Sequence, residues 1–295
     1  MGLVNEAMSK HVTLSYLAGH YDLELQPESA GGVTVTSVTD DVDRVRPGSL
    51  LLLPDAQEGD IETAMAKGAY AVVLGGSWRE KPPISDIPVL YGDPTGEQIG
   101  AMASDMAGSP STYLAVFAVA GSDADEVHAT VIRVADFLHM LGNPVAVISS
   151  AESRSLERRL LLHYPIGSLD VQNTLSVSVE DGAAAVVIAL DDETLRLGAL
   201  DSLGVDVLGC VDAGRQGVDT DQMLSRLRDG YGFELSENAQ TVGTTAESDE
   251  LAEQSGIASD PDGQRRLSLA IAMALGVGVR RSTIRGALKV SKELR

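Results

Sequence analysis

The feature that most constrains the fold is a series of short apolar runs that alternate with amphipathic segments. In the second half of the chain the runs lie at residues 112–121, 144–150, 183–190 and 205–211. Strands that are apolar on both faces are typical of a parallel sheet covered by helices on each side. The sequence therefore predicts an α/β fold with a mainly parallel sheet flanked by helices.

The helix expected after the first of these runs has the clearest signals. Asp123 is suited to cap its start, and Gly142 is suited to end it. A further helical segment is expected at 192–203, and the chain from about residue 220 onward is expected to be mainly helical. The apolar stripe of the first helix consists of Val127, Val131, Val134, Leu138 and Leu141.

The first half of the chain shows the same alternation on a smaller scale. Gly, Ser and Pro gather at Gly108–Ser111, where they favour a break between domains. We therefore expect two domains, residues 1–109 and residues 110–295. Within the first, strands are expected at 33–38, 50–53, 70–74 and 87–93, and helices at 60–68 and 96–108.

The composition excludes several classes of protein. The 295 residues include 22 Lys and Arg against 43 Asp and Glu, for a net charge of −21. No nucleic-acid partner is expected, because phosphate neutralisation needs clustered cations. The lone Cys210 excludes a disulfide framework and is interpreted as a buried small residue. No apolar run reaches the ~20 residues that cross a bilayer, so we expect a cytoplasmic protein without a transmembrane segment.

The loop after the run at 112–121 lies where many α/β proteins bind phosphate. Backbone amides and a helix dipole attract the anion there, and a working P-loop adds a Lys for the phosphates and a hydroxyl for Mg²⁺. Here Asp125 replaces the Lys and Glu126 replaces the hydroxyl, so we expect a vestigial loop that binds no cofactor. Its positions are Gly121, Ser122, Asp123, Ala124, Asp125 and Glu126.

Several motifs together resemble the Mur ligases of peptidoglycan synthesis, in particular the UDP-N-acetylmuramyl-tripeptide synthetases. Residues 41–48 (DVDRVRPG) resemble the family's D-S-R-x-V-x-P-G, and residues 64–73 (AMAKGAYAVV) its A-x-x-x-G-A-x-A-V-V. Residues 116–127 stand where the family has G-T-N-G-K-T-T, and residues 269–288 resemble the helices that close its ATPase domain. The resemblance implies a UDP-binding-like N-terminal domain and a P-loop-type, ATPase-like central domain. The family's C-terminal ligase domain is expected to be absent.

The chain departs from the family at the positions that bind substrate and metal and that carry out the reaction. The Ser and Arg of the UDP-side pocket are Val42 and Asp43, and the Glu that holds Mg²⁺ is Ala189. The family's T-N-L-x-x-D-H-L-D falls on residues 211–219 without its Asn, its first Asp and its His. The lysine that these ligases carbamylate falls near Asp229. The apolar framework is therefore kept while the polar site is replaced.

We interpret the chain as a catalytically inactive Mur-ligase-like protein, with no catalytic residue and no metal. It would act in or regulate cell-wall synthesis or cell division, through a protein partner or a second copy of itself. Two alternatives stay open. One is an ATP-dependent muramyl-peptide–amino-acid ligase with displaced catalytic groups, and the other is a non-catalytic sensor of UDP-muramyl precursors.

Positive charge is concentrated at the C-terminal end of this acidic chain. On a helix, Arg281, Arg285 and Lys289 share one face. This face is either a solvated helix end whose cations suit the dipole or a docking surface for an acidic partner. Elsewhere the acids at 123–126 and 191–193 are interpreted as caps and solvated turns, and the histidines as non-catalytic.

Overall fold

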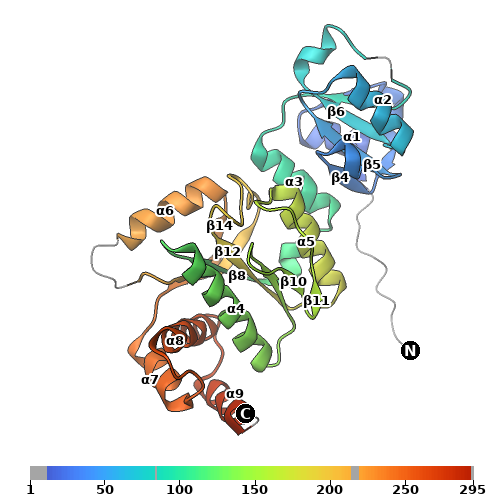
Figure 1. Ribbon diagram of the computed structural model, residues 1–295. Helices are drawn as coiled ribbons and strands as arrows, with labels where there is room; N and C mark the ends of the chain where they lie inside the picture. The colour runs from blue at the N-terminus through green and yellow to red at the C-terminus, as the bar shows by residue number, and fades with distance from the viewer. Residues whose placement is uncertain (1–11, 84, 214–218, 294–295) are drawn as a thin grey trace, which may run out of the picture. The chain divides into compact units, whose positions relative to one another are not determined.

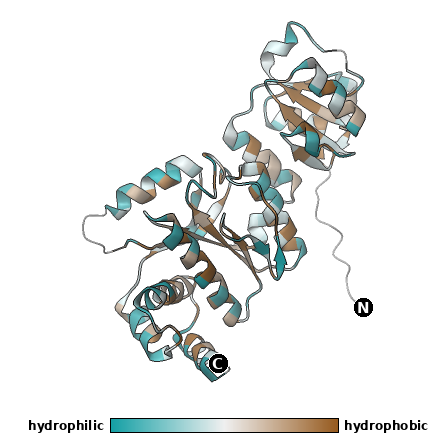
Figure 2. Cartoon of the chain, in the orientation of Figure 1, coloured by the Kyte–Doolittle hydropathy of each residue, from teal (hydrophilic) through white to brown (hydrophobic). Residues whose placement is uncertain are grey.

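The computed structural model describes residues 12–83, 85–213 and 219–293. The chain divides between Ser109 and Pro110 into two compact units. Each unit has its own sheet and its own apolar core (Figures 1 and 2). The reading of these units as UDP-binding-like and ATPase-like domains remains a prediction.

The first unit is built on a five-stranded sheet in the order β2-β7-β6-β5-β4. Strands β4 to β7 run parallel, and β2 pairs antiparallel with β7 at one edge. The elements are α1 (Leu14–His20), β2 (Glu24–Gln26), β4 (Ser37–Thr39), β5 (Ser49–Leu53), α2 (Glu58–Lys67), β6 (Ala71–Leu74), β7 (Val89–Tyr91) and α3 (Gly96–Met106), with a separate pair β1 (Val12–Thr13) and β3 (Thr34–Val35).

Local signals account for most of these elements. Leu50, Leu51 and Leu52 of β5 are almost wholly enclosed and Leu53 is partly exposed, so the apolar run forms the buried strand that its composition predicts. Helix α2 ends at Gly68, whose φ of 91° is the left-handed conformation that glycine adopts without strain. The run at 33–38 is not one strand, because its first part pairs with β1 and its second with β5.

The second unit is built on a seven-stranded sheet in the order β11-β10-β9-β12-β8-β13-β14. The five strands from β9 to β14 in this order run parallel, and the hairpin β10–β11 is antiparallel. The elements are β8 (Ala115–Ala120), α4 (Ala124–Met140), β9 (Val145–Ile148), β10 (Arg154–Ser155), β11 (Arg158–Arg159), α5 (Ser168–Glu180), β12 (Ala185–Leu190), β13 (Gly204–Cys210), α6 (Thr220–Tyr231), β14 (Glu234–Val242), α7 (Ala246–Ser255), α8 (Pro261–Gly276) and α9 (Arg281–Glu293).

Two layers of helices enclose this sheet, as a fully apolar parallel sheet requires. On one face α4, α7, α8 and α9 pack into a single apolar cluster with alternate residues of the strands. On the other face α5 packs with the turns before β13 and with the end of α6. Figure 2 shows the strands of the sheet in brown between these layers. The predicted α/β class with a mainly parallel sheet is confirmed.

Helix α8 approaches the sheet closely at one glycine. A Cβ atom on Gly209 of β13 would lie 2.5 Å from Sδ of Met273, which is wholly buried on α8. The absence of a side chain at Gly209 therefore sets how near α8 lies to the sheet. No helix among the described residues is both long enough and apolar enough to span a membrane.

The expected helix at 192–203 is wrong, because this segment forms turns. The Asp191 carboxylate accepts the amides of Glu193 and Thr194, which gives the backbone an alternative to a helical turn. Gly198 and Ser202 have φ values of 70° and 67°, which no α-helix accommodates. The connection from β12 to β13 is therefore made of turns, whereas α5 precedes β12 in the chain, and the strand β14 interrupts the expected helical C-terminal third.

Candidate functional site at the carboxyl edge of the second sheet

The candidate site lies where β8, β12 and β13 end side by side. Ala120, the last residue of β8, is in register with Leu190 of β12 and with Cys210 of β13. The loops that begin at Gly121, Asp191 and Val211 therefore start from one edge of the sheet. In open parallel sheets this edge is where ligands bind.

The amide of Ser122, in the expected phosphate loop, already has an anionic partner. This backbone N–H donates to Oδ2 of Asp212 over 2.6 Å. Asp212 follows β13 and is only 2% exposed. A phosphate approaching this amide would have to displace a buried carboxylate, which is held by a short, charge-assisted bond.

Neighbouring side chains also fill the space over the loop glycine. A Cβ atom on Gly121 would lie 2.7 Å from Cγ2 of Val211 and 3.0 Å from Cγ2 of Val127. In a working loop the glycine leaves room for a phosphate to approach the backbone. Here that room is taken by two valines, so the glycine serves packing.

The acids of the loop have structural partners. Asp123 caps α4, because its Oδ1 accepts the amide of Glu126 over 2.9 Å, as predicted. The Glu126 carboxylate receives both Nε and Nη2 of Arg266 on α8, with Nε at 3.0 Å. This contact raises the pKa of the Arg266 guanidinium against the opposing effect of its partial burial. Asp125 is exposed on the first turn.

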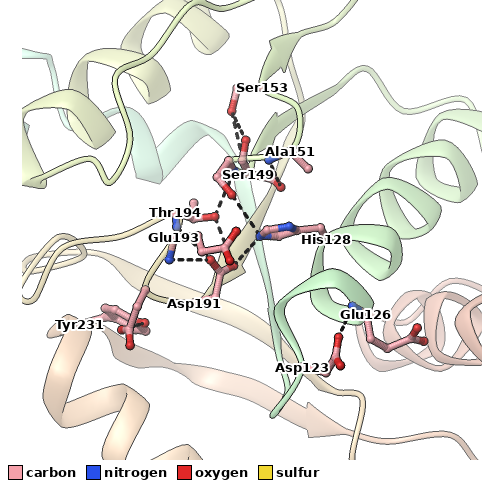
Figure 3. Close-up of polar contacts among 12 residues, drawn as sticks. Asp123, Glu126, His128, Ser149, Ala151, Ser153, Asp191, Glu193, Thr194 and Tyr231 are labelled. Atoms are coloured by element: carbon pink, nitrogen blue, oxygen red, sulfur yellow. Dashed lines mark hydrogen bonds and ion pairs between the residues drawn. The ribbon is translucent and has the colours of Figure 1, made fainter.

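Asp191 is a buried carboxylate that bonds to the loop after β12 and to α4. This corrects its interpretation as part of a solvated turn. The side chain is 9% exposed. Its Oδ1 accepts the amides of Glu193 and Thr194 at 3.0 and 2.9 Å. Its Oδ2 faces Nε2 of His128 at 3.0 Å and the Thr194 hydroxyl at 3.2 Å (Figure 3). A carboxylate with this many donors ties the end of β12 to α4.

The contacts of His128 do not form a nucleophilic relay. Its Nε2 lies 3.0 Å from Asp191 and 3.2 Å from the hydroxyl of Ser150, so both neighbours meet the same nitrogen. In a Ser–His–Asp triad the carboxylate holds one ring nitrogen while the serine uses the other. Figure 3 shows the imidazole turned toward Asp191, whereas Glu126 points away from it.

Other groups near this edge are bound or shielded. The Tyr231 hydroxyl donates to Asp192 over 2.7 Å, and burial together with this carboxylate raises the pKa of Tyr231. Burial also raises the pKa of the Cys210 thiol, and the buried position predicted for it is confirmed. Ala189, where the family's metal-binding Glu was expected, is wholly buried inside β12. The described residues contain no group of three His, Cys, Asp or Glu placed to hold a metal.

Three further sequence-predicted positions are described by their own contacts or exposure. In the first unit Asp43 is bonded to Nζ of Lys67 over 2.6 Å, which lowers the pKa of the carboxyl. Asp229 is exposed on α6, and Gly214–Val218, part of the expected catalytic segment, fall outside the described residues. Among the expected surface cations, Arg281 turns back onto α7 and pairs with Glu247 at 3.3 Å and Glu250 at 2.9 Å.

No family model matches the chain. It is 28% identical over 201 residues to a protein of Pseudomonas aeruginosa named UDP-N-acetylmuramoyl-L-alanyl-D-glutamate--2,6-diaminopimelate ligase, a match that covers 66% of this chain and 41% of the relative. A protein of the same name from Pseudomonas putida is 26% identical over 191 residues, which is 63% of this chain and 38% of that protein.

Solved structures of Mur ligases resemble this chain in fold as well. The crystal structure of MurF from Acinetobacter baumannii superposes with a TM-score of 0.58 at 15% identity, over 95% of this chain and 68% of the other. This chain resembles the Mur ligases. The resemblance inferred from the motifs is thereby confirmed, and the Mur-ligase-like chain spans about two fifths of the length of its curated relatives.

Sequence reasoning missed three features of this Mur-ligase-like site. It assigned no partner to Asp191, to Asp212 or to Glu126, and each partner is far along the chain. A usable signal was the placement of Asp191 and Asp212 directly after two buried strands. Carboxylates at the ends of neighbouring parallel strands are expected to lie near the loop that follows β8.

Proposed function

We propose that this protein is a catalytically inactive Mur-ligase-like protein that acts in or regulates peptidoglycan synthesis by binding a partner. The observation that carries the proposal is the Asp212 carboxylate seated on the Ser122 amide. The group that would receive a nucleotide phosphate in an active relative is used here inside the protein. The names of the relatives supply the setting in cell-wall synthesis.

The charge of the loop supports the same proposal. No lysine stands in the loop, Asp125 is exposed there, and Glu126 is engaged by Arg266. Two like charges ~4 Å apart repel by roughly 4 kcal/mol at an effective dielectric near 20. An incoming triphosphate would meet carboxylates where relatives of the P-loop type present a cation.

We expect no saturable binding of MgATP and no ATP turnover. Calorimetric titration should show no binding heat up to about 1 mM MgATP, which corresponds to less than roughly 4 kcal/mol of binding free energy. The single change Asp125→Lys should not create binding, because Asp212 still occupies the loop amide. The Pseudomonas aeruginosa relative is the positive control. A dissociation constant below about 100 µM for the wild-type chain would refute the inactive assignment and favour a ligase with displaced groups.

A sensor of UDP-muramyl precursors is the second candidate, and the pair Asp43–Lys67 bears on it. The lysine offsets the charge that we expected to repel a pyrophosphate, although Asp43 itself stands at the position of the arginine in the family's pocket. We still expect no rise in melting temperature with UDP-N-acetylmuramyl-dipeptide. A ligand at 100 times its dissociation constant would add ~2.7 kcal/mol. A distinct rise with the muramyl dipeptide, absent with UDP alone, would establish the sensor instead.

A further inference from the structure

The basic C-terminal helix borders a groove rather than a flat face. Helices α7 and α9 lie side by side in the second unit (Figure 1) and enclose a groove of about 280 Å³. Its floor is apolar: Leu251 of α7 and Leu288 of α9 close it from below at 1% and 4% exposure, and the methylene stems of the lining cations add apolar surface. Its rim carries three cations, Arg285, Lys289 and Lys292. We call this feature the α7–α9 groove.

The cations of the rim are available to an incoming anion. Among the described residues, neither Arg285 nor Lys292 forms an ion pair with a carboxylate. Lys289 approaches Glu293 only to 4.0 Å, with both side chains more than half exposed, and such pairs contribute little. Arg281, by contrast, is engaged by α7 and does not belong to the rim.

The position of Lys292 concentrates the charge further. A Cβ atom on Gly256, the left-handed residue that ends α7, would lie 3.2 Å from Nζ of Lys292. The ammonium therefore sits over the carboxyl end of α7, where a helix dipole favours a cation. Lys292 therefore lies at one end of the groove, and Arg285 and Lys289 lie along α9.

The chemistry of the groove selects its occupant. A free inorganic anion would use the rim but leave the leucine floor unused. A bilayer needs a broad apolar face, and the exposed apolar residue of α9 is Val290 alone among its described large side chains. A second copy of a chain with net charge −21 is repelled by the first. An acidic helix with one aliphatic side chain matches both the rim and the floor.

We propose that the α7–α9 groove binds an acidic amphipathic helix of a partner protein, with its carboxylates on Arg285, Lys289 and Lys292 and an aliphatic side chain packed against the methylene stems of these cations, above Leu251 and Leu288. This inference rests on the proposed function, since it names the surface and the chemistry of the partner that an inactive Mur-ligase-like protein would bind. Helix-in-groove recognition of this kind uses anchors spaced three or four residues apart.

The test uses the full chain and a fluorescein-labelled helical peptide with Glu and Leu at helical spacing, followed by fluorescence polarisation. We expect saturable binding that weakens at least about 10-fold between roughly 50 and 500 mM salt, because exposed charges are screened. The same peptide with Lys in place of Glu should not bind. Inorganic phosphate and vesicles containing phosphatidylglycerol should not compete with the acidic peptide.

Two kinds of variant separate charge from shape. Arg285→Glu with Lys289→Glu should weaken peptide binding at least about 10-fold. Arg226→Glu with Arg228→Glu on α6 makes the same change of net charge on exposed residues away from the groove. This control pair should change the affinity for the peptide less than about 2-fold. Gln254→Trp, which alters no charge, should obstruct the groove and weaken binding comparably. Melting temperatures of all three should stay near that of the wild type.

Several results would overturn the groove proposal. These are equal binding by the two charge-reversal pairs, binding that survives Gln254→Trp, the absence of saturable peptide binding, or displacement by vesicles. A dimer in light scattering that dissociates on Arg285→Glu with Lys289→Glu would make a second copy the occupant. None of these results involves nucleotide, so the groove and the inactive assignment fail separately.

Discussion

Replacement of Asp191 by alanine is expected to lower the free energy of unfolding by about 3 kcal/mol, since buried donors lose their acceptor. The amides of Glu193 and Thr194 and the imidazole of His128 would be left without this carboxylate. For a unit of this size the melting temperature should fall by about 6–12 °C. Chemical and thermal denaturation followed by circular dichroism measure both quantities.

The neighbouring Glu193 supplies the matched control. Its side chain is exposed, so Glu193→Ala should change the free energy of unfolding by no more than about 0.5 kcal/mol. Asp191→Asn keeps an oxygen acceptor but removes the charge. Its loss of unfolding free energy should lie between those of Asp191→Ala and Glu193→Ala. If Asp191→Ala is as stable as Glu193→Ala, the buried Asp191 carboxylate does not stabilise the fold.

Substitution of Gly209 by valine is the second change expected to have a large effect. The new side chain would meet Met273 at the point where α8 lies closest to the sheet. Overpacking of a close-packed core costs about 1–3 kcal/mol, and we expect the upper part of that range because Met273 is wholly buried. Denaturant titration of the variant measures the loss.

A double variant tests whether this loss comes from the contact itself. Met273→Ala alone should destabilise by about 2–5 kcal/mol, because it leaves a cavity. Combined with Gly209→Val, the valine should fill part of that cavity, and the total loss should be smaller than the sum by about 1 kcal/mol or more. Simple additivity of the two changes would show that Gly209 does not control the approach of α8.

Much of the sheet could be predicted because its strands are defined by local composition. The runs that became β5, β6, β9 and β12 are apolar at successive positions, and no distant residue is needed to recognise them. The turns at 192–203 could not be predicted in this way. There a side chain and two left-handed residues override an apolar pattern that suits a helix.

The sequence predicted the position of the candidate site but not the hydrogen bonds and ion pairs that its residues form. The position of the loop follows from a strand that ends directly before Gly121 and a helix capped by Asp123. The partners of Ser122 and Glu126 come from positions 90 and 140 residues away. No local pattern reports contacts of that range, because they depend on which strands become neighbours.

The charge of the C-terminal helix shows the same limit. Helical spacing placed Arg281, Arg285 and Lys289 on one face, but it could not show that α7 supplies carboxylates to the first of them. The surface available to a partner is therefore shifted toward Lys292. A reversal of Arg281 would break contacts within the unit, so it is a poor probe of partner binding.

The Asp212 carboxylate on the Ser122 amide also has a consequence for how the protein responds to its surroundings. A nucleotide-binding protein is stabilised in proportion to the logarithm of its ligand concentration. Under the proposed inactive assignment, a chain that carries its own anion in that position would gain nothing from the ligand. Its population of folded molecules, and whatever it holds on its surface, would therefore stay constant while the energy supply of the cell rises and falls.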